Sequence, residues 1–342
     1  MVKQPFDIDF VVTWVNGRDP EWLNKYNKYS MNDTLDVKDA RYRDFYIFRY
    51  WFRAVQKYAP WVHHVYLVTD HQVPEWLDTE NDGITVVDHS QIIPAEYLPV
   101  FNSNAIELNL YKINNLSEHF VYFNDDMFLN KPVMPKDFFS EDGRPKDTAG
   151  LNAIQPKFDF DYIHVNNMKI INENFDKKLV MKKQFFKFIN PINLELNIYT
   201  MLLFFWPQFT RFFDLHYPYS FKKSNMEKVI NENRNAYRQT MMDRFRGKND
   251  ISIWLVRYYS LVNGDFSVRS PRIGKIYDLF TQFDAAIKDI SRSKHKLIVI
   301  NDNAKINRED FRKISQSLKD SFEEKFSSKS SYEKEDTSEK NR

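Results

Sequence analysis

HFVYFNDD, at residues 119–126, is an apolar run that ends abruptly in three polar side chains. Its aromatic and β-branched residues favour a strand. Three earlier runs have the same character: DFVVTWV (9–15), HVYLVTD (64–70) and ITVVDH (84–89). Two helical stretches are interspersed with these runs, near 41–58 and 103–115. The alternation predicts an α/β fold in which helices cover a parallel sheet, and ligands of such sheets collect at the carboxyl ends of the strands.

The rhythm of strands and helices changes after about residue 150. We therefore predict an α/β core formed by 1–150 and 215–325, interrupted by a mostly helical insertion at 151–214. A strand-like run, KLIVIND at 296–302, is predicted to return to the sheet. Residues 326–342 are polar and charged, so we expect a disordered tail there.

The amino-acid composition favours a folded globular protein and argues against a nucleic-acid-binding one. The 342 residues are 42% hydrophobic and 16% aromatic, enough to bury an enzyme-sized core. With 49 Lys and Arg against 47 Asp and Glu, the chain is not built as a nucleic-acid-binding surface. It has no cysteine, no run long enough for a membrane-spanning helix and no apolar leader, which favours a cytoplasmic protein.

Adjacent carboxylates at the end of a strand indicate a site for a hard divalent cation. Asp125 and Asp126 follow the run at 119–124, and Asp302 follows the run at 297–300. Because Mg²⁺ takes only one or two protein carboxylates together with substrate phosphates, one Asp from each strand would suffice. Turns and helix caps use the same residue types, so the pattern alone leaves that alternative open.

Other polar residues are candidates for binding a nucleotide or for proton transfer. In the turn after the first strand, Trp14 suits a base, and Asn16 and Asp19 suit hydrogen bonds to it. Arginines spaced i, i+4 on one helix face suit a diphosphate, and a hydroxyl and a carboxylate with the same spacing suit a sugar. Further along, a histidine suits proton exchange and an arginine suits charge on a phosphoryl group. These residues are Arg49, Arg53, Ser103, Glu107, His216 and Arg246.

Taken in order, these stretches resemble the conserved regions of the Stealth family, which includes capsular polysaccharide phosphotransferases. DIDFVVTWVNGRDPEW resembles its first region, and the sequence from Arg41 through FVYFNDDMFLNKPV resembles its second. LHYPYS with the helix at 240–263 resembles the third, and LIVINDN the fourth. Asn249 stands before Asp250 where the animal relative has Glu, which leaves the role of that carboxylate position open.

The resemblance implies a Rossmann-like, glycosyltransferase-A-like core that uses Mg²⁺ or Mn²⁺ and a UDP-hexose donor. Hexose 1-phosphate would pass to a hydroxyl of a lipid-linked or growing polysaccharide, releasing UMP. Asp125, Asp126 and Asp302 would be the metal and catalytic carboxylates. Ser103, Glu107, His216 and Arg246 would occupy the remaining active-site positions. Asp126 and His216 both suit the general base, and the sequence does not choose between them.

Two alternatives to this function are a conventional glycosyltransferase, which releases UDP, and a non-catalytic nucleotide-sugar-binding protein. A third, a peripheral membrane scaffold, would leave the four motifs unexplained. Lysines and aromatic residues near 180–213 suit either a surface that rests on the inner face of an anionic membrane or a helix pair packed on the core.

Overall fold

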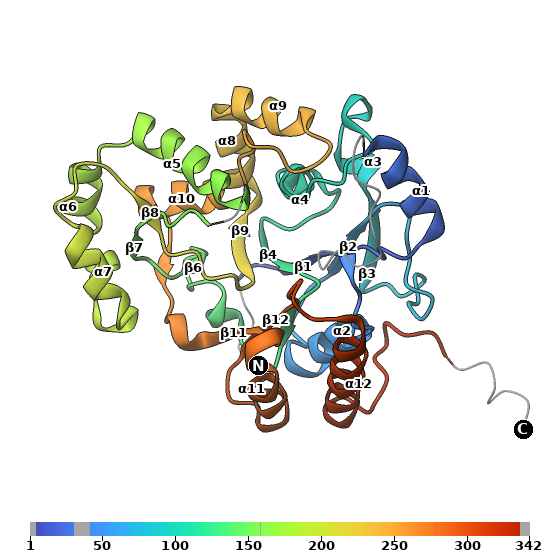
Figure 1. Cartoon of the computed structure of the whole chain (residues 1–342). Helices are drawn as coiled ribbons and strands as arrows, with labels where there is room; N and C mark the ends of the chain where they lie inside the picture. The colour runs from blue at the N-terminus through green and yellow to red at the C-terminus, as the bar shows by residue number, and fades with distance from the viewer. Residues whose placement is uncertain (1–4, 31–41, 158, 336–342) are drawn as a thin grey trace, which may run out of the picture. The chain divides into compact units, whose positions relative to one another are not determined.

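The computed structural model describes residues 5–30, 42–157 and 159–335 and divides the chain into two compact units (Figure 1). Unit 1 comprises 1–8, 89–121 and 135–273, and unit 2 comprises 9–88, 122–134 and 274–342. This division does not coincide with the expected boundaries at 150 and 215, because residues 151–214 belong to a larger unit that also contains 89–121 and 215–273.

Unit 2 contains the predicted parallel strands. β1 (Ile8–Thr13) pairs in parallel with β2 (Val65–Thr69), and β2 pairs in parallel with β3 (Ile84–Asp88). β4 (His119–Asn124), whose last three residues lie in unit 2, follows β1 in the strand order. The helices at the start of this unit are α1 (Pro20–Tyr29) and α2 (Phe48–Tyr58). These strands confirm the predicted α/β class, whereas the glycosyltransferase-A-like arrangement stays a prediction.

A second sheet in unit 2 corrects the expected position of the run at 296–302. β12 (Leu297–Asn301) pairs in parallel with β11 (Gly274–Asp278) and antiparallel with β5 (Met127–Leu129), forming a separate three-stranded sheet. α11 (Leu279–Arg292) and α12 (Arg308–Lys325) pack side by side next to it (Figure 1). The run is apolar enough to predict a strand, but the strands with which it pairs depend on contacts between segments distant in sequence.

The core of unit 2 is aromatic. Trp51 and Phe52 on α2 are fully buried, and Phe10 on β1 lies with its ring centroid 4.8 Å from that of Phe123 on β4. The apolar runs that predict these strands therefore supply the side chains that hold α2 against them. Full burial of such aromatic side chains stabilises the fold by about 1.5 to 3 kcal/mol each.

Unit 1 is mostly helical, with short strands. The beginning of β4 neighbours β9 (Tyr219–Lys222) in the strand order, and two short ladders join β6 to β10 and β7 to β8. These strands are β6 (Lys146–Asp147), β10 (Ser267–Val268), β7 (Leu151–Asn152) and β8 (Arg211–Phe212). The helices are α3 (His89–Ile92), α4 (Ser103–Glu107), α5 (Tyr162–Asn174), α6 (Lys177–Phe188), α7 (Leu196–Leu203), α8 (Lys223–Glu232), α9 (Arg234–Met242) and α10 (Trp254–Asn263).

α10 is the central helix of unit 1 and packs against α5, α6 and α8. It ends at Gly264, whose φ of 74° is the left-handed conformation that a glycine adopts at little cost. Short 3₁₀ turns complete the two units: Ala95–Tyr97, Leu110–Lys112, Pro135–Asp137, Asp159–Asp161, Pro191–Asn193 and Pro271–Ile273. Within the described part of the chain, no helix combines the length and apolarity needed to cross a membrane.

The C-terminal segment corrects the expected tail at 326–342. Phe326 and Glu333 are buried, and the backbone N–H of Asp78 donates to the carbonyl of Tyr332 at 2.9 Å. Residues 326–335 therefore pack on unit 2 although most of them are polar. The last seven residues of the predicted tail lie outside the described residues.

Candidate functional site

The carboxylates predicted to bind a metal lie in a turn between two strands of unit 2 and just after a third strand. Asp125 and Asp126 form the turn between β4 and β5, and the carbonyl of Asp126 accepts a hydrogen bond of 2.9 Å from the N–H of Ile300. The antiparallel register places Val299 opposite Met127. The end of β12, which leads to Asp302, therefore lies beside this turn.

Asp302 forms a bidentate ion pair with Arg43. The Nε and Nη2 atoms of Arg43 donate to the two carboxylate oxygens of Asp302, each at 2.7 Å, and both side chains are largely buried. Burial raises the pKa of Asp302 above its usual value, while the guanidinium of Arg43 opposes that rise. Arg43 also donates to the carbonyls of Asn303 and Ile306, so it orders the loop after β12.

Arg43 is not among the residues predicted from the sequence, because an arginine just before a helix carries no periodic signal. Its role follows only from a contact that spans more than 250 residues.

The carboxylates fit a divalent cation in chemical kind, but they do not form a three-ligand cluster. Asp125 is exposed and Asp126 is half-buried, and oxygen donors of this sort suit Mg²⁺ or Mn²⁺. Both oxygens of Asp302 are held by Arg43, so direct ligation by Asp302 requires the exchange of one of those bonds. A site that uses the Asp125–Asp126 turn together with substrate phosphates needs no such exchange.

Another acidic group does bring three possible ligands together. Among residues 5–30, 42–157 and 159–335, only Asp70, His71 and Asp88 have ligand atoms that all lie within 4.8 Å of one another. The two carboxylates of this group already have partners within the protein. Lys25 lies 2.6 Å from Asp70, and the ring and backbone nitrogens of His71 both contact Asp88. The arrangement ties together the ends of β2 and β3.

The turn after β1 has a clear structural role. The N–H of Asn16 donates to Gln72 at 2.9 Å, and the side chain of Gln72 donates back to the Asn16 carbonyl at 3.1 Å. Asp19 caps α1 by accepting from the N–H groups of Glu21 and Trp22. Their contacts with a nucleotide stay predictions, and the cap occupies one oxygen of Asp19.

Trp14 lies parallel to Phe48, with ring centroids 5.6 Å apart and an interplanar angle of 1°. The indole is half-buried. The geometry leaves the predicted contact between Trp14 and a base untested.

Arg49 and Arg53 have different environments although they lie one turn apart on α2. The guanidinium of Arg49 lies over the ring of Trp76 at 5.8 Å, and its side chain is half-buried. Arg53 is 5% exposed and donates to Glu333, to Glu323 and to the carbonyl of Phe326. The donors of Arg53 are thus engaged inside unit 2, and its contact with a diphosphate stays a prediction.

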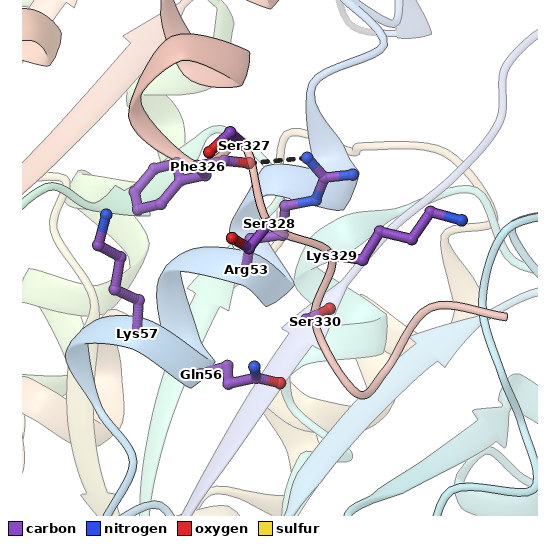
Figure 2. A pocket seen from close by; sticks show the side chains of 8 residues that line it. All are labelled: Arg53, Gln56, Lys57, Phe326, Ser327, Ser328, Lys329 and Ser330. Carbon is purple, nitrogen blue, oxygen red and sulfur yellow. Dashed lines mark hydrogen bonds between the residues drawn. The ribbon is translucent and has the colours of Figure 1, made fainter. Parts of the chain in front are cut away.

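Arg53 lines a hollow of about 280 Å³. Figure 2 shows its guanidinium donating to the carbonyl of Phe326. The lining residues are Arg53, Gln56, Lys57 and the segment 326–330. The hollow lies between α2 and the C-terminal segment, so it reflects how that segment packs.

Unit 1 brings two of the predicted catalytic residues together. The Nη2 atom of Arg246 donates to the hydroxyl of Ser103 at 2.8 Å, and the guanidinium lies over the ring of Phe160 at 5.0 Å. Arg246 is exposed, so its charge is available to an anion. Glu107 is buried on α4, about one turn after Ser103.

A buried carboxylate holds the loop that carries Arg246. One oxygen of Asp250 accepts from the side chains of Asn102 and Asn104 and from the N–H of Gly247, at 2.8, 3.1 and 3.0 Å. Asp250 has no exposed surface, and burial raises its pKa to about 6. Asp250 therefore fastens the loop at 243–250 to the residues on either side of Ser103, a role that its sequence position did not reveal.

His216 lies in the segment between β8 and β9 and is half-buried. Asp214, two residues earlier, is fully buried and pairs with Arg257 at 2.8 Å. The carbonyl of Leu215, the residue just before His216, accepts from the hydroxyl of Tyr219 at 2.6 Å. The backbone that leads into His216 is thus anchored.

Comparison with known proteins assigns the class. Models of two conserved regions of Stealth proteins match this chain, region 1 at residues 6–34 and region 2 at 41–147. An exopolysaccharide phosphotransferase of Lactiplantibacillus plantarum is 51% identical over 331 residues, which is 96% of this chain and 97% of that protein. A capsular polysaccharide phosphotransferase of Streptococcus pneumoniae is 39% identical, with 97% and 100% covered. A receptor polysaccharide phosphotransferase of Streptococcus oralis is 40% identical, with 89% and 92% covered.

This similarity extends over nearly the whole chain and defines an enzyme of the phosphotransferase class. The chain belongs to the Stealth family.

Proposed function

We propose that this enzyme transfers hexose 1-phosphate from a UDP-sugar to a hydroxyl of a cell-surface polysaccharide or its lipid-linked precursor. A phosphodiester forms between the hexose and the acceptor, and UMP leaves. Support comes from the names of relatives that match nearly the whole chain and from the placement of the Asp125–Asp126 turn beside the end of β12. The second observation carries the proposal, because it groups carboxylates at strand ends as phosphoryl transfer requires.

The proposed roles follow from charge. Asp125 and Asp126 would hold Mg²⁺ or Mn²⁺. Asp302 lies nearby, and its carboxylate is held by a hydrogen bond from Arg43. The bound ion would offset negative charge on the phosphate oxygens. In unit 1, Arg246, oriented by Ser103, would offer positive charge to an anionic group of a substrate.

One group must accept the proton of the acceptor hydroxyl. Asp126 and His216 both remain candidates for this base, and Glu107 is proposed to contact the sugar. A pH profile of turnover in Asp126→Asn and in His216→Gln separates the two candidates, because removal of the base abolishes the rise in rate that its deprotonation causes.

The decisive experiment resolves the nucleotide product. The enzyme is incubated with Mg²⁺ or Mn²⁺, a panel of UDP-hexoses and an oligosaccharide or lipid-linked acceptor, and UMP is separated from UDP. We expect acceptor-dependent UMP that disappears with a chelator and returns when the cation is restored. Asp126→Asn should lower the rate at least 100-fold, a loss typical when one stabilising charge is removed. The matched control is Asp284→Asn, since Asp284 is exposed on α11.

UDP as the product would overturn the proposal in favour of a conventional glycosyltransferase. Binding of a UDP-sugar with no nucleotide released from any acceptor would favour a nucleotide-sugar-binding protein.

A further inference from the structure

α6 and α7 form a hairpin whose two ends are pinned. At one end the ammonium of Lys177 donates to the carbonyls of Leu203 and Trp206, each at 2.6 Å. At the other end Asn190 and Asn197 exchange two hydrogen bonds, of 2.7 and 3.2 Å. The start of α6 therefore lies beside the end of α7, and the helices run antiparallel as one structural element.

One face of this hairpin is anchored in unit 1. Val180, Met181 and Phe188 of α6 are buried, as are Leu196 and Thr200 of α7. The burial of these residues accounts for the position of the hairpin without any contribution from its opposite face.

The opposite face is strongly apolar and exposed. Of the eighteen large hydrophobic side chains exposed in the described chain, ten lie between residues 179 and 206. Phe186 is 83% exposed, Leu202 72% and Phe205 90%. Ile198, Leu202 and Phe205 follow one another at intervals of four and three residues, so they form a stripe along α7 and its extension. An apolar face of this density marks an interaction surface.

Lysines border the apolar side chains. Lys178, Lys182 and Lys183 are exposed on α6, and none of them forms an ion pair with another described residue. Lys182 and Lys183 lie three or four residues from Phe186, so they share its side of the helix. Residues 177–206 contain five lysines and a single acidic residue, Glu195.

We propose that the α6–α7 hairpin docks this enzyme on the surface of an anionic lipid bilayer. Phe186, Leu202, Phe205 and Trp206 enter the boundary between headgroups and acyl chains. The lysines meet the anionic headgroups at the same level. The positive charge argues against a second copy of the chain as the occupant, because a two-fold contact would bring like-charged lysines together. This surface adds to the proposed function a location where a lipid-linked acceptor is presented, but binding itself does not depend on the reaction.

The test measures binding of the full-length enzyme to vesicles by flotation. Vesicles of phosphatidylcholine alone are compared with vesicles that also contain phosphatidylglycerol. We expect binding to the anionic vesicles only, weakened by added salt, with a blue shift in tryptophan fluorescence. Phe186→Ser with Phe205→Ser should reduce binding at least tenfold. Phe280→Ser is the matched control, since that phenylalanine is 50% exposed on α11.

Charge variants test the contribution of the lysines to membrane binding. Lys182→Glu and Lys183→Glu should each reduce binding to anionic vesicles about fivefold or more, as expected from the attraction of one lysine to an anionic surface. Lys169→Glu on α5, where the lysine is 72% exposed, should have a smaller effect. Circular dichroism of each variant checks that it folds.

Equal binding by the phenylalanine variants and the wild type would overturn the proposal, as would failure to bind anionic vesicles. A concentration-dependent dimer that Phe205→Ser abolishes would also overturn it and assign the face to a second copy. These outcomes are separate from the proposed chemistry, because the phenylalanine variants should still release UMP with a water-soluble acceptor and lose rate only with an acceptor embedded in vesicles.

Discussion

Replacement of Arg257 by methionine should destabilise unit 1 more than any exposed substitution. The guanidinium is 2% exposed and lies 2.6 Å from Asp147 and 2.8 Å from Asp214. It also donates to the carbonyls of Thr148 and Phe213, at 2.9 and 2.7 Å. Four acceptors from two segments of the chain, 147–148 and 213–214, therefore depend on one side chain, and methionine fills a similar volume but satisfies none of them.

The magnitude follows from the burial of Asp214, which has no exposed side-chain surface. Removing one partner of a buried ion pair costs about 3 to 5 kcal/mol, because the other charge is left uncompensated. Arg211 still contacts Asp214 at 2.9 Å, so the lower half of that range is expected. This is a large part of a typical stability of about 5 to 15 kcal/mol. Arg257→Lys should retain part of the stability, because a single ammonium reaches fewer of the acceptors.

The assay is urea unfolding followed by circular dichroism and tryptophan fluorescence. Arg272→Met is the matched control, since that guanidinium is 71% exposed and lies 3.7 Å from Glu195. The control should change the free energy of unfolding by no more than about 0.5 kcal/mol. A loss below about 1 kcal/mol in Arg257→Met would refute the argument that this buried network supports unit 1.

Three further results are expected. Arg43→Met should lower stability by about 1 to 3 kcal/mol in urea unfolding, because Asp302 loses two charged hydrogen bonds; an unchanged midpoint would contradict this. Burial lowers the pKa of His164 to about 4, so the stability that its neutral form provides is complete above the usual pKa of 6.5 and is lost as the pH falls toward 4. Thermal melts should therefore show a steeper loss over that window in the wild type than in His164→Gln, and parallel curves would exclude the effect. Gly247→Ala should cost about 1 to 3 kcal/mol, because a Cβ atom there overlaps the carboxylate of Asp243; an unchanged melting temperature would show that Asp243 moves aside freely.

The parallel strands could be predicted because their signal is local. The runs at 9–15 and 64–70 are nearly continuous in apolar residues, as strands buried on both faces require, and the run at 84–89 has three apolar β-branched residues. The run at 296–302 has the same signal and is indeed a strand, but its neighbours β11 and β5 are set by pairing between distant segments. Periodicity shows that a strand exists without showing which sheet it joins.

The packed C-terminal segment illustrates the same limit. Residues 326–335 read as a polar tail because their composition lacks a hydrophobic run. Their order depends on Phe326 packing against Tyr58 and on Glu333 pairing with Arg53. Neither partner can be inferred from the local sequence, since both lie more than 260 residues away.

The part of the candidate site that lies at strand ends could be predicted from the sequence. Asp126 and the end of β12 lie side by side, as expected for polar residues that follow apolar strands. The sequence did not reveal that Arg43 holds Asp302 or that Asp250 fastens the loop of Arg246, because both are contacts between distant segments. Asp19 was predicted to bind a nucleotide, but its side chain caps a helix. A polar residue at a strand-to-helix turn suits both roles, and the sequence does not separate them.

The pairing of Arg53 with Glu333 has a consequence for biosynthesis. The two residues are separated by 280 positions, so the α2 contact remains open until almost the entire chain has left the ribosome. Most of unit 1 is encoded between residues 89 and 273 and can fold during translation. The side of α2 that meets residues 326–335 therefore stays uncovered until translation is nearly complete.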